Sequence, residues 1–279
     1  MALIPPYFAD CVVAIGVDPL NDDERRWVAS GFLYGDYVRD NEDGTKKYKV
    51  YLATNRHVFE NLPNVYLRFN PISNEPACEY LLSLLDKNGA KLWFPHPKAE
   101  VDVAVIPINI KLLREHAMQV SYFQSVNNVA NVDKLNELGV TEGDFVYALG
   151  FPMGIVGGER STVIVRSGSI ARIRDALVRA NQEYLIDAFI FPGNSGGPVV
   201  SKPEALAIQG TKSQNAAYLI GIIKSYVSYQ DVAVSSQSKR PRIIFEENSG
   251  LAAVHPIDFV QEAIKGHVKL VEGNKKEQK

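Results

Sequence analysis

A serine lies within a run of turn-forming residues at positions 191–198, FPGNSGGP. Glycine permits sharp backbone turns and lets another molecule approach the backbone N–H groups closely. We therefore expect the segment to present Ser195 as a nucleophile. The amides of Gly193 and Ser195 would point at one spot and stabilise an oxyanion there. The alternative interpretation is an ordinary surface turn, since Gly, Asn, Ser and Pro all favour turns.

A serine hydroxyl needs a general base, and the base needs a partner that orients it. His57 is the best candidate base, because it follows the apolar stretch 49–54 and would project from the end of a strand. The other four histidines lie between prolines, in a polar connection or beside the last predicted helix: His96, His116, His255 and His267. A lone histidine at a strand end is more often structural than catalytic, so the assignment depends on the neighbouring motifs.

Asp102 is the candidate orienting residue, in the apolar segment 101–106, VDVAVI. An isolated charge within such a run is costly unless it is hydrogen-bonded. The alternative is that Asp102 is an ordinary outward-facing residue on a half-buried strand. Asp86 adjoins a Lys-Asn-Gly turn, and Asp187 precedes Ser195 by only eight positions and would support its loop.

The elements that must position these residues are mostly short strands joined by turns. Apolar or alternating segments predict strands at 11–17, 27–34, 49–54, 65–69, 91–94, 101–108, 144–149, 161–173, 183–190, 199–200 and 218–224. Asp43-Gly44 predicts a hairpin turn. Residues 235–242 are polar and predict a mobile loop. This spacing of strands is typical of an all-β sandwich or barrel.

We predict a single domain, residues 1–279, whose parts are an N-terminal half (1–110), a connection with a short helix near its end (111–138), a C-terminal half (139–255), a C-terminal helix (256–267) and a flexible tail (272–279). The apolar spacing of Ile257, Val260 and Ile264 predicts the helix, and Gly266 is its expected end.

The composition limits the classes of function. Hydrophobic residues make up 46% and charged residues 22%, which is typical of a globular protein with a substantial core. A net charge of −2 gives no indication of nucleic acid or an anionic membrane as a partner. The two cysteines do not form a disulfide framework, and no metal-ligand spacing or cofactor motif occurs. No signal peptide or membrane span is predicted, and the expected location is the cytoplasm.

Three motifs together resemble the trypsin-like serine proteases of the chymotrypsin fold, especially the bacterial HtrA-like (DegP-like) branch. They are TNRHV at 54–58, DVAV at 102–105 and GNSGGP at 193–198, in the order His, Asp, Ser. The segments 150–154 (GFPMG), 167–170 (SGSI) and 254–260 (VHPIDFV) also look like that branch.

The resemblance implies two antiparallel six-stranded β-barrels, with a C-terminal α-helix and an active cleft between the barrels. His57 would act as general base and then general acid, Asp102 would orient it, and Ser195 would form an acyl-enzyme. Gly193 and Ser195 would supply the oxyanion hole. The expected activity is endopeptidase hydrolysis of a polypeptide substrate, without a cofactor or a metal ion.

Two departures from the family pattern limit which properties of the family can be expected of this chain. Asn194 cannot form the ion pair by which a new N-terminus activates digestive members, and no PDZ domain is expected after the helix. By resemblance, Phe189, Phe191, Lys224 and Ser225 line the substrate pocket. Phe189 stands where trypsins carry an acidic residue, so a preference for Lys or Arg in the substrate is not expected. We expect a small or medium apolar side chain at the cleaved bond. Lys224 near the pocket would instead favour an acidic side chain.

Two other functions fit the same residues. A catalytically silent protease fold would bind peptides or a protein, for example by strand addition at a sheet edge. An esterase or other acyl transferase would use the same three groups on a different substrate.

Overall fold

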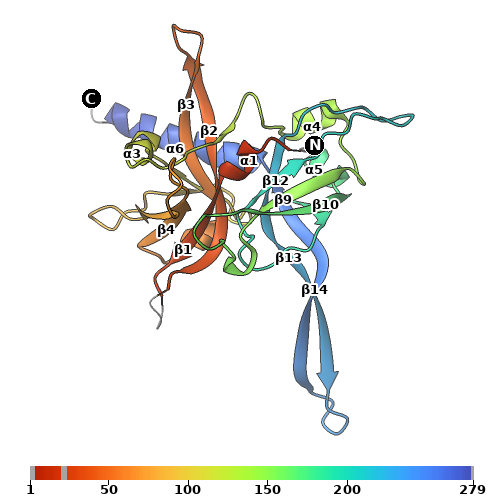
Figure 1. Cartoon of the computed structure of the whole chain (residues 1–279). Coiled ribbons are helices and arrows are strands. Elements are labelled where there is room, and N and C mark those ends of the chain that lie inside the picture. Colours follow the sequence, from red (N-terminus) through yellow and green to blue (C-terminus); the bar gives the residue numbers. More distant parts are fainter. Residues whose placement is uncertain (1–3, 20–23, 278–279) are drawn as a thin grey trace.

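The computed structural model describes residues 4–19 and 24–277. Two β-rich halves pack together, and a long helix lies against them (Figure 1). The fold class predicted from the sequence is confirmed: the chain consists mainly of antiparallel strands, with a closed six-stranded barrel, a half-barrel sheet and a C-terminal helix. No helix among the described residues is long and apolar enough to cross a membrane.

The first half is one sheet with the strand order β5-β4-β1-β2-β3-β7-β6, and an eighth strand pairs in parallel with β2. Among the described residues it has eight strands rather than the six expected, two of them only two residues long, and the two end strands do not pair with each other. The strands are β1 Val12–Val17, β2 Arg26–Asp40, β3 Lys46–Thr54, β4 Asn64–Phe69, β5 Cys78–Ser83, β6 Phe94–Pro95, β7 Ala104–Pro107 and β8 Phe123–Gln124. Short helices lie beside them: α1 Tyr7–Asp10, α2 Arg56–Phe59 and α3 Ile110–Glu115.

The second half is a closed barrel with the strand order β10-β11-β14-β13-β12-β9. Its strands are β9 Phe145–Gly150, β10 Ile164–Arg172, β11 Tyr184–Asp187, β12 Pro198–Ser201, β13 Leu219–Val234 and β14 Pro241–Pro256. The helical turns η1 Pro152–Gly154 and α5 Arg174–Leu177 lie between strands. The predicted short helix of the connection is present as α4, Val132–Leu138.

Alternating burial explains why these segments form sheets. In β4, Val65, Leu67 and Phe69 are buried while the residues between them are half-exposed, which is the period of two expected for a strand with one face in the core. Each half has its own apolar core. A third cluster joins Phe32 and Tyr51 of the first half to Leu149 and Phe151 of the second. The halves are therefore packed against each other, and a site between them is held in place.

The C-terminal helix is longer than predicted. Helix α6 spans Asp258–Glu277, so Gly266 lies inside it and six residues of the predicted tail are helical. Its buried face, Val260, Ala263, Ile264 and His267, packs against the core, and this packing outweighs the roughly 1 kcal/mol penalty of an interior glycine. Residues 278–279 lie outside the described residues, and the flexibility of the tail stays a prediction.

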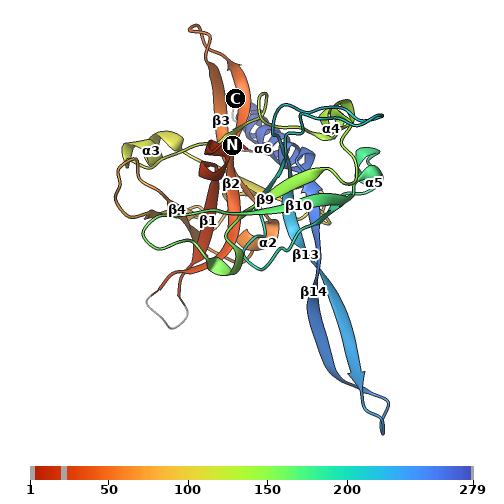
Figure 2. The ribbon, with the colours of Figure 1, turned by 45° about the vertical axis from the view of Figure 1, so that its right-hand side comes forward.

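Strand β13 also differs from the expectation of a strand that ends at residue 224. Strands β13 and β14 continue beyond the barrel as a long two-stranded ribbon (Figures 1 and 2). The polar segment predicted as a mobile loop shrinks to the connection at 235–240, because β14 begins at Pro241.

Candidate active site

Ser195 lies in a tight turn between β11 and β12, where it is partly exposed. The Asn194 N–H donates to the Phe191 carbonyl at 3.0 Å, and the Gly197 N–H donates to the Asn194 carbonyl at 2.9 Å. Gly193 and Gly196 have φ values of +98° and +82°. These are conformations that residues with a side chain rarely adopt, so the glycines on either side of Ser195 shape the turn.

Ser30, on β2 of the first half, makes three hydrogen bonds to the second half, two of them to this turn. Its N–H donates to the Ser195 carbonyl at 3.0 Å. Its hydroxyl donates to the Gly193 carbonyl at 2.7 Å and accepts the N–H of Phe151 at 2.9 Å. The Thr54 hydroxyl in turn donates to the Ser30 carbonyl at 2.8 Å. The first half therefore fixes the backbone of the serine turn in the second half.

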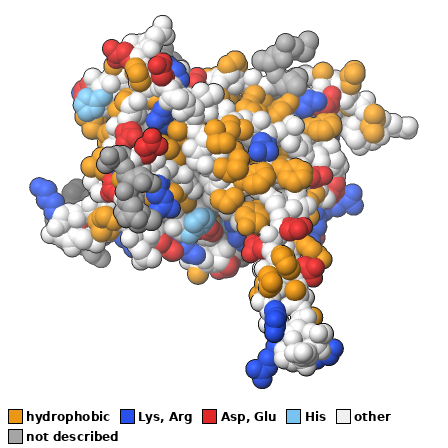
Figure 3. Space-filling view, turned by 60° about the horizontal axis from the view of Figure 1, so that its bottom comes forward, with side chains coloured by type: hydrophobic (Ala, Val, Ile, Leu, Met, Phe, Trp, Pro, Cys, Tyr) orange, Lys and Arg blue, Asp and Glu red, His pale blue; other side chains and the backbone are white. Residues whose placement is uncertain are grey.

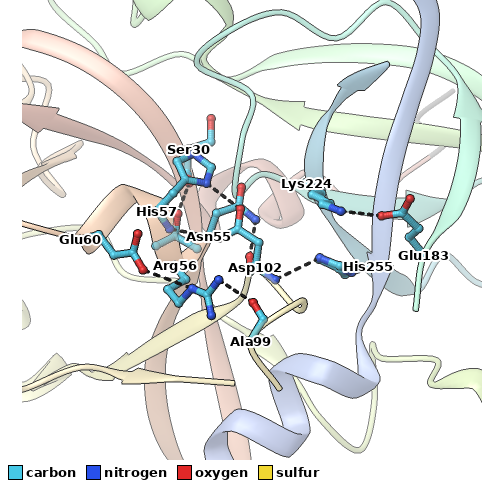
Figure 4. A network of polar contacts seen from close by, with 11 residues as sticks. Ser30, Asn55, Arg56, His57, Glu60, Ala99, Asp102, Glu183, Lys224 and His255 are labelled. Atoms are coloured by element: carbon cyan, nitrogen blue, oxygen red, sulfur yellow. Dashed lines mark hydrogen bonds and ion pairs between the residues drawn. The ribbon is translucent and has the colours of Figure 1, made fainter. Parts of the chain in front are cut away.

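The candidate base lies on the first half. His57 is in the single-turn helix α2, directly after β3, rather than on the strand itself. Its Nδ1 lies 2.6 Å from Asp102 Oδ2, and its backbone N–H donates to Asp102 Oδ1 at 3.0 Å (Figure 4). Both carboxylate oxygens are thus engaged by the same residue. Since the carboxylate accepts, Nδ1 carries the proton and Nε2 is left as the basic nitrogen.

Asp102 is itself held by two neighbours. The Asn55 side-chain amide donates to the Asp102 carbonyl at 2.8 Å, and the Asp102 N–H donates to His255 Nε2 at 3.2 Å (Figure 4). The other ring nitrogen of His255 lies 2.9 Å from the Gln182 carbonyl, which can only accept. His255 is therefore the neutral Nδ1–H tautomer, and its burial lowers its pKa.

The contacts between His57 and Asp102 shift both pKa values. The hydrogen bond to Asp102 raises the pKa of His57, although partial desolvation opposes the shift. Burial alone would raise the pKa of Asp102, but the hydrogen bonds and charge of His57 outweigh it, and the pKa is lowered. The arrangement favours an ionised Asp102 beside a histidine that is more basic than usual.

The amides of Gly193 and Ser195 are available as donors. Within the part of the chain that the structure describes, neither N–H donates to a protein acceptor. The Pro192 carbonyl instead accepts the N–H of Met153 at 2.6 Å. Because a trans peptide directs its C=O and N–H in opposite directions, this bond turns the Gly193 N–H away from Met153. Met153 has a φ of +56°, an uncommon conformation for a non-glycine residue.

The serine turn and the histidine helix are neighbours. A Cβ added to Gly196 would lie 2.2 Å from the Thr54 hydroxyl, so the residue after Ser195 contacts a residue three positions before His57. No hydrogen bond joins the Ser195 hydroxyl to His57. Catalytic hydrogen bonds are often longer in a free enzyme and tighten when substrate binds.

The predicted pocket residues lie on the second half. Phe189 is 58% exposed, Ser225 is exposed, and the guanidinium of Arg166 lies 5.1 Å above the Phe191 ring. The Lys224 ammonium pairs with Glu183 Oε2 at 2.8 Å (Figure 4). The positive charge of Lys224 is thus already matched, which argues against its use for an acidic substrate side chain. The lining of the pocket stays a prediction.

Ser30, His255 and Met153 were missed by sequence reasoning. Their contributions are hydrogen bonds to backbone groups of residues distant in the sequence. The one available signal was position: Ser30 precedes a glycine on an apolar strand, and Met153 lies in the GFPMG segment. Among the described residues, no group of three or more His, Cys, Asp or Glu side chains could hold a metal ion.

Comparison with known proteins places the chain in a family. The family model of the trypsin-like peptidase domain matches residues 29–206, and the chain belongs to this family. It is a trypsin-like serine protease by family, and the matched range includes His57, Asp102 and Ser195. The comparison with curated proteins found no match.

One similar solved structure is the HtrA-type protease AlgW, in a variant form with a tripeptide. The sequences are 20% identical, and the TM-score is 0.46. The match covers 92% of this chain and 60% of that chain. The present chain thus matches less than two thirds of the length of AlgW.

Proposed function

We propose that the protein is a serine endopeptidase of the HtrA-like branch, in which Ser195 is the nucleophile, His57 the general base and Asp102 the orienting carboxylate. The observation that carries this proposal is the double contact of His57 with Asp102, which leaves His57 Nε2 as the basic nitrogen on the first half. The backbone N–H groups of Gly193 and Ser195, which have no acceptor among the described residues, would donate to the oxyanion.

In the acylation step, His57 Nε2 takes the hydroxyl proton of Ser195 as the oxygen attacks the carbonyl carbon of the scissile peptide bond. The carbonyl oxygen becomes an oxyanion that accepts hydrogen bonds from the Gly193 and Ser195 amides. His57 then gives the proton to the leaving amine, and the C–N bond breaks. The products of this step are a free amine and an ester on Ser195.

In the deacylation step, water repeats the sequence. His57 removes a proton from the water as its oxygen attacks the ester carbonyl, and the proton returns to Ser195 when the ester C–O bond breaks. Asp102 stays ionised throughout and stabilises the imidazolium form of His57. This role fits the lowered pKa of Asp102 and the raised pKa of His57.

For the substrate, we propose a polypeptide whose side chain at the cleaved bond is apolar and of small or medium size. The exposed Phe189 and the half-buried Phe191 offer apolar surface beside the serine turn, and Lys224 is neutralised by Glu183. Figure 3 shows hydrophobic side chains gathered on the surface near the base of the ribbon formed by β13 and β14.

Hydrolysis of an unfolded protein and of fluorescence-quenched peptides tests the proposal. The wild-type chain should cleave them, and Ser195→Ala and His57→Ala should lose the activity. Ser213→Ala, which replaces an exposed serine in the loop between β12 and β13, should keep it. Ester cleavage without peptide cleavage would indicate an acyl transferase instead. Peptide binding without turnover, unchanged in Ser195→Ala, would indicate a binding module.

A further inference from the structure

The ribbon formed by β13 and β14 leaves the barrel, and none of the other strands that the structure describes pairs with it there. Strand β12 pairs with β13 only as far as Ile222, and β11 pairs with β14 only from Leu251 onward. Between Ser228 and Val234, β13 has β14 as its single partner. The ribbon projects away from the body of the protein in both ribbon views (Figures 1 and 2). A lone two-stranded ribbon is marginally stable in water. Its unpaired edges also expose N–H and C=O groups that can pair with a strand of another chain.

The outer edge of β14 carries three consecutive large apolar residues. Ile243, Ile244 and Phe245 are 54%, 62% and 50% exposed. Their cross-strand neighbours on β13 include Val232, which pairs with Ile244 and is 43% exposed. Large apolar side chains grouped on an exposed edge strand are typical of an interaction surface.

The charges of the ribbon are segregated along β14. Arg242 lies toward the tip, next to Lys239 and Arg240 of the connecting turn, and Glu246 and Glu247 lie toward the barrel, with the apolar triplet 243–245 between them. Figure 3 shows this order on the surface: basic side chains at the tip of the ribbon, then hydrophobic ones, then acidic ones nearer the body.

This order is self-complementary. If two β14 edges pair antiparallel about a two-fold axis at Ile244, each Arg242 stands opposite Glu246 of the second copy, and each Ile243 stands opposite Phe245 of the second copy. Opposite charges and apolar residues in directly opposed positions both stabilise strand pairs. A two-fold contact needs one patch that complements itself, and β14 provides it.

Strand β13 lacks this property. Between Ser225 and Val234 it carries one carboxylate, Asp231, and no Lys or Arg, so this segment offers no pair of opposite charges for self-pairing. On β14, the side chain of Glu246 accepts a hydrogen bond from the Tyr226 hydroxyl through Oε1 at 3.2 Å. The Oε2 atom of Glu246 is not used in that bond.

We propose that the β14 edge of the ribbon, residues 241–248, is a docking surface for a second copy of this chain. The two ribbons pair antiparallel into a four-stranded sheet centred on Ile244. The contact joins the second halves of the two copies, and it does not depend on the proposed catalytic roles of Ser195, His57 and Asp102.

Sedimentation of the intact chain over a range of concentrations tests this proposal through charge reversals. The wild type should show a monomer–dimer equilibrium. Arg242→Glu and Glu246→Arg should each weaken dimerisation by roughly 10-fold or more, because each places like charges opposite one another twice per dimer. The double variant should recover most of the affinity. The matched control Arg114→Glu, an exposed arginine outside the ribbon, should dimerise as the wild type does.

Cross-linking tests the register. In a Cys78→Ser background, in which the remaining Cys11 is buried, Ile244→Cys should give a covalent dimer with a short bis-maleimide, and Val234→Cys should not. Circular dichroism and the melting temperature check that each variant is folded. A monomer at every concentration would overturn the proposal. A dimer insensitive to both charge reversals, or one without cross-linking at position 244, would overturn it as well.

Discussion

The hydroxyl of Ser30, on the first half, donates to the carbonyl of Gly193, on the second half, at 2.7 Å, and both groups are buried. The same hydroxyl accepts the N–H of Phe151. One side chain therefore fixes the peptide that follows Gly193 and the loop that supports Pro192. The turn that presents Ser195 depends on contact between the two halves as well as on its own glycines.

Replacing Ser30 tests this dependence. Ser30→Ala leaves a buried carbonyl and a buried N–H without a partner, and each loss costs about 1–3 kcal/mol. We expect kcat/KM for a peptide substrate to fall by roughly 10- to 100-fold, with a lower melting temperature. Ser213→Ala is the control. Unchanged kinetics in folded Ser30→Ala would show that the hydrogen bonds of the Ser30 hydroxyl do not position the serine turn.

The pH dependence of hydrolysis should reflect the raised pKa of His57. A general base must be neutral, so the rate should fall as pH decreases through this pKa. Because the pKa is raised, the acid limb of kcat/KM should lie above the unperturbed value of about 6.5. A midpoint below that value, or a flat profile from acid to neutral pH, would contradict the assignment of His57.

Asp102→Asn should remove the acceptor that selects the Nδ1–H tautomer of His57. Loss of this aspartate in Ser-His-Asp enzymes reduces kcat on the order of 10⁴-fold, and we expect a loss of that size here. Substrate binding should change far less, so the substitution should lower kcat and leave KM nearly unchanged. The measurement is steady-state kinetics, and a loss of less than about tenfold would argue against the triad.

The same pair should contribute to folding stability in a limited pH window. The raised pKa of His57 stabilises the fold below its unfolded value of about 6.5, and this contribution is lost as pH rises through the folded pKa. The lowered pKa of Asp102 stabilises the fold above about 3.9, and this contribution is lost as pH falls through the folded pKa. The stability difference between wild type and Asp102→Asn should be largest between about pH 4 and 6.5, as measured by urea unfolding. A difference that is constant with pH would contradict the coupling.

His255 should act as a positioning residue for Asp102. His255→Phe removes the acceptor of the Asp102 N–H, and we expect kcat/KM to fall by roughly 5- to 100-fold. His255→Gln can offer an acceptor oxygen and should recover part of the activity. A purely structural role predicts equal losses in both variants at equal stability, and that result would exclude positioning.

Gly196→Ala tests the close packing behind the nucleophile. A Cβ at this position would lie 2.2 Å from the Thr54 hydroxyl and 2.3 Å from the Ser30 carbonyl, at a φ of +82°. We expect a large loss of both stability and activity. The control is Gly158→Ala, where a Cβ would meet nothing within 4 Å. Equal melting temperatures for the two variants would contradict the packing shown here.

The sequence was sufficient to predict the strand-rich fold and to nominate His57, Asp102 and Ser195, because residue type and local motif carry that information. It did not reveal Ser30 or His255, since a serine on a strand and a histidine before a helix look ordinary until tertiary contacts place them at Gly193 and Asp102. The ribbon was missed for a related reason. The segment 225–234 mixes polar and apolar residues, and its pairing with β14 is what makes it a strand.

The central claim is that Ser195 is a nucleophile activated by His57. The most direct test is labelling with a fluorophosphonate, followed by mass spectrometry of the modified peptide. We predict a single adduct on Ser195, formed much more slowly in His57→Ala and Asp102→Asn and absent in Ser195→Ala. Labelling that persists in Ser195→Ala, or no labelling of a folded wild-type protein that also fails to cleave peptides, would contradict the account.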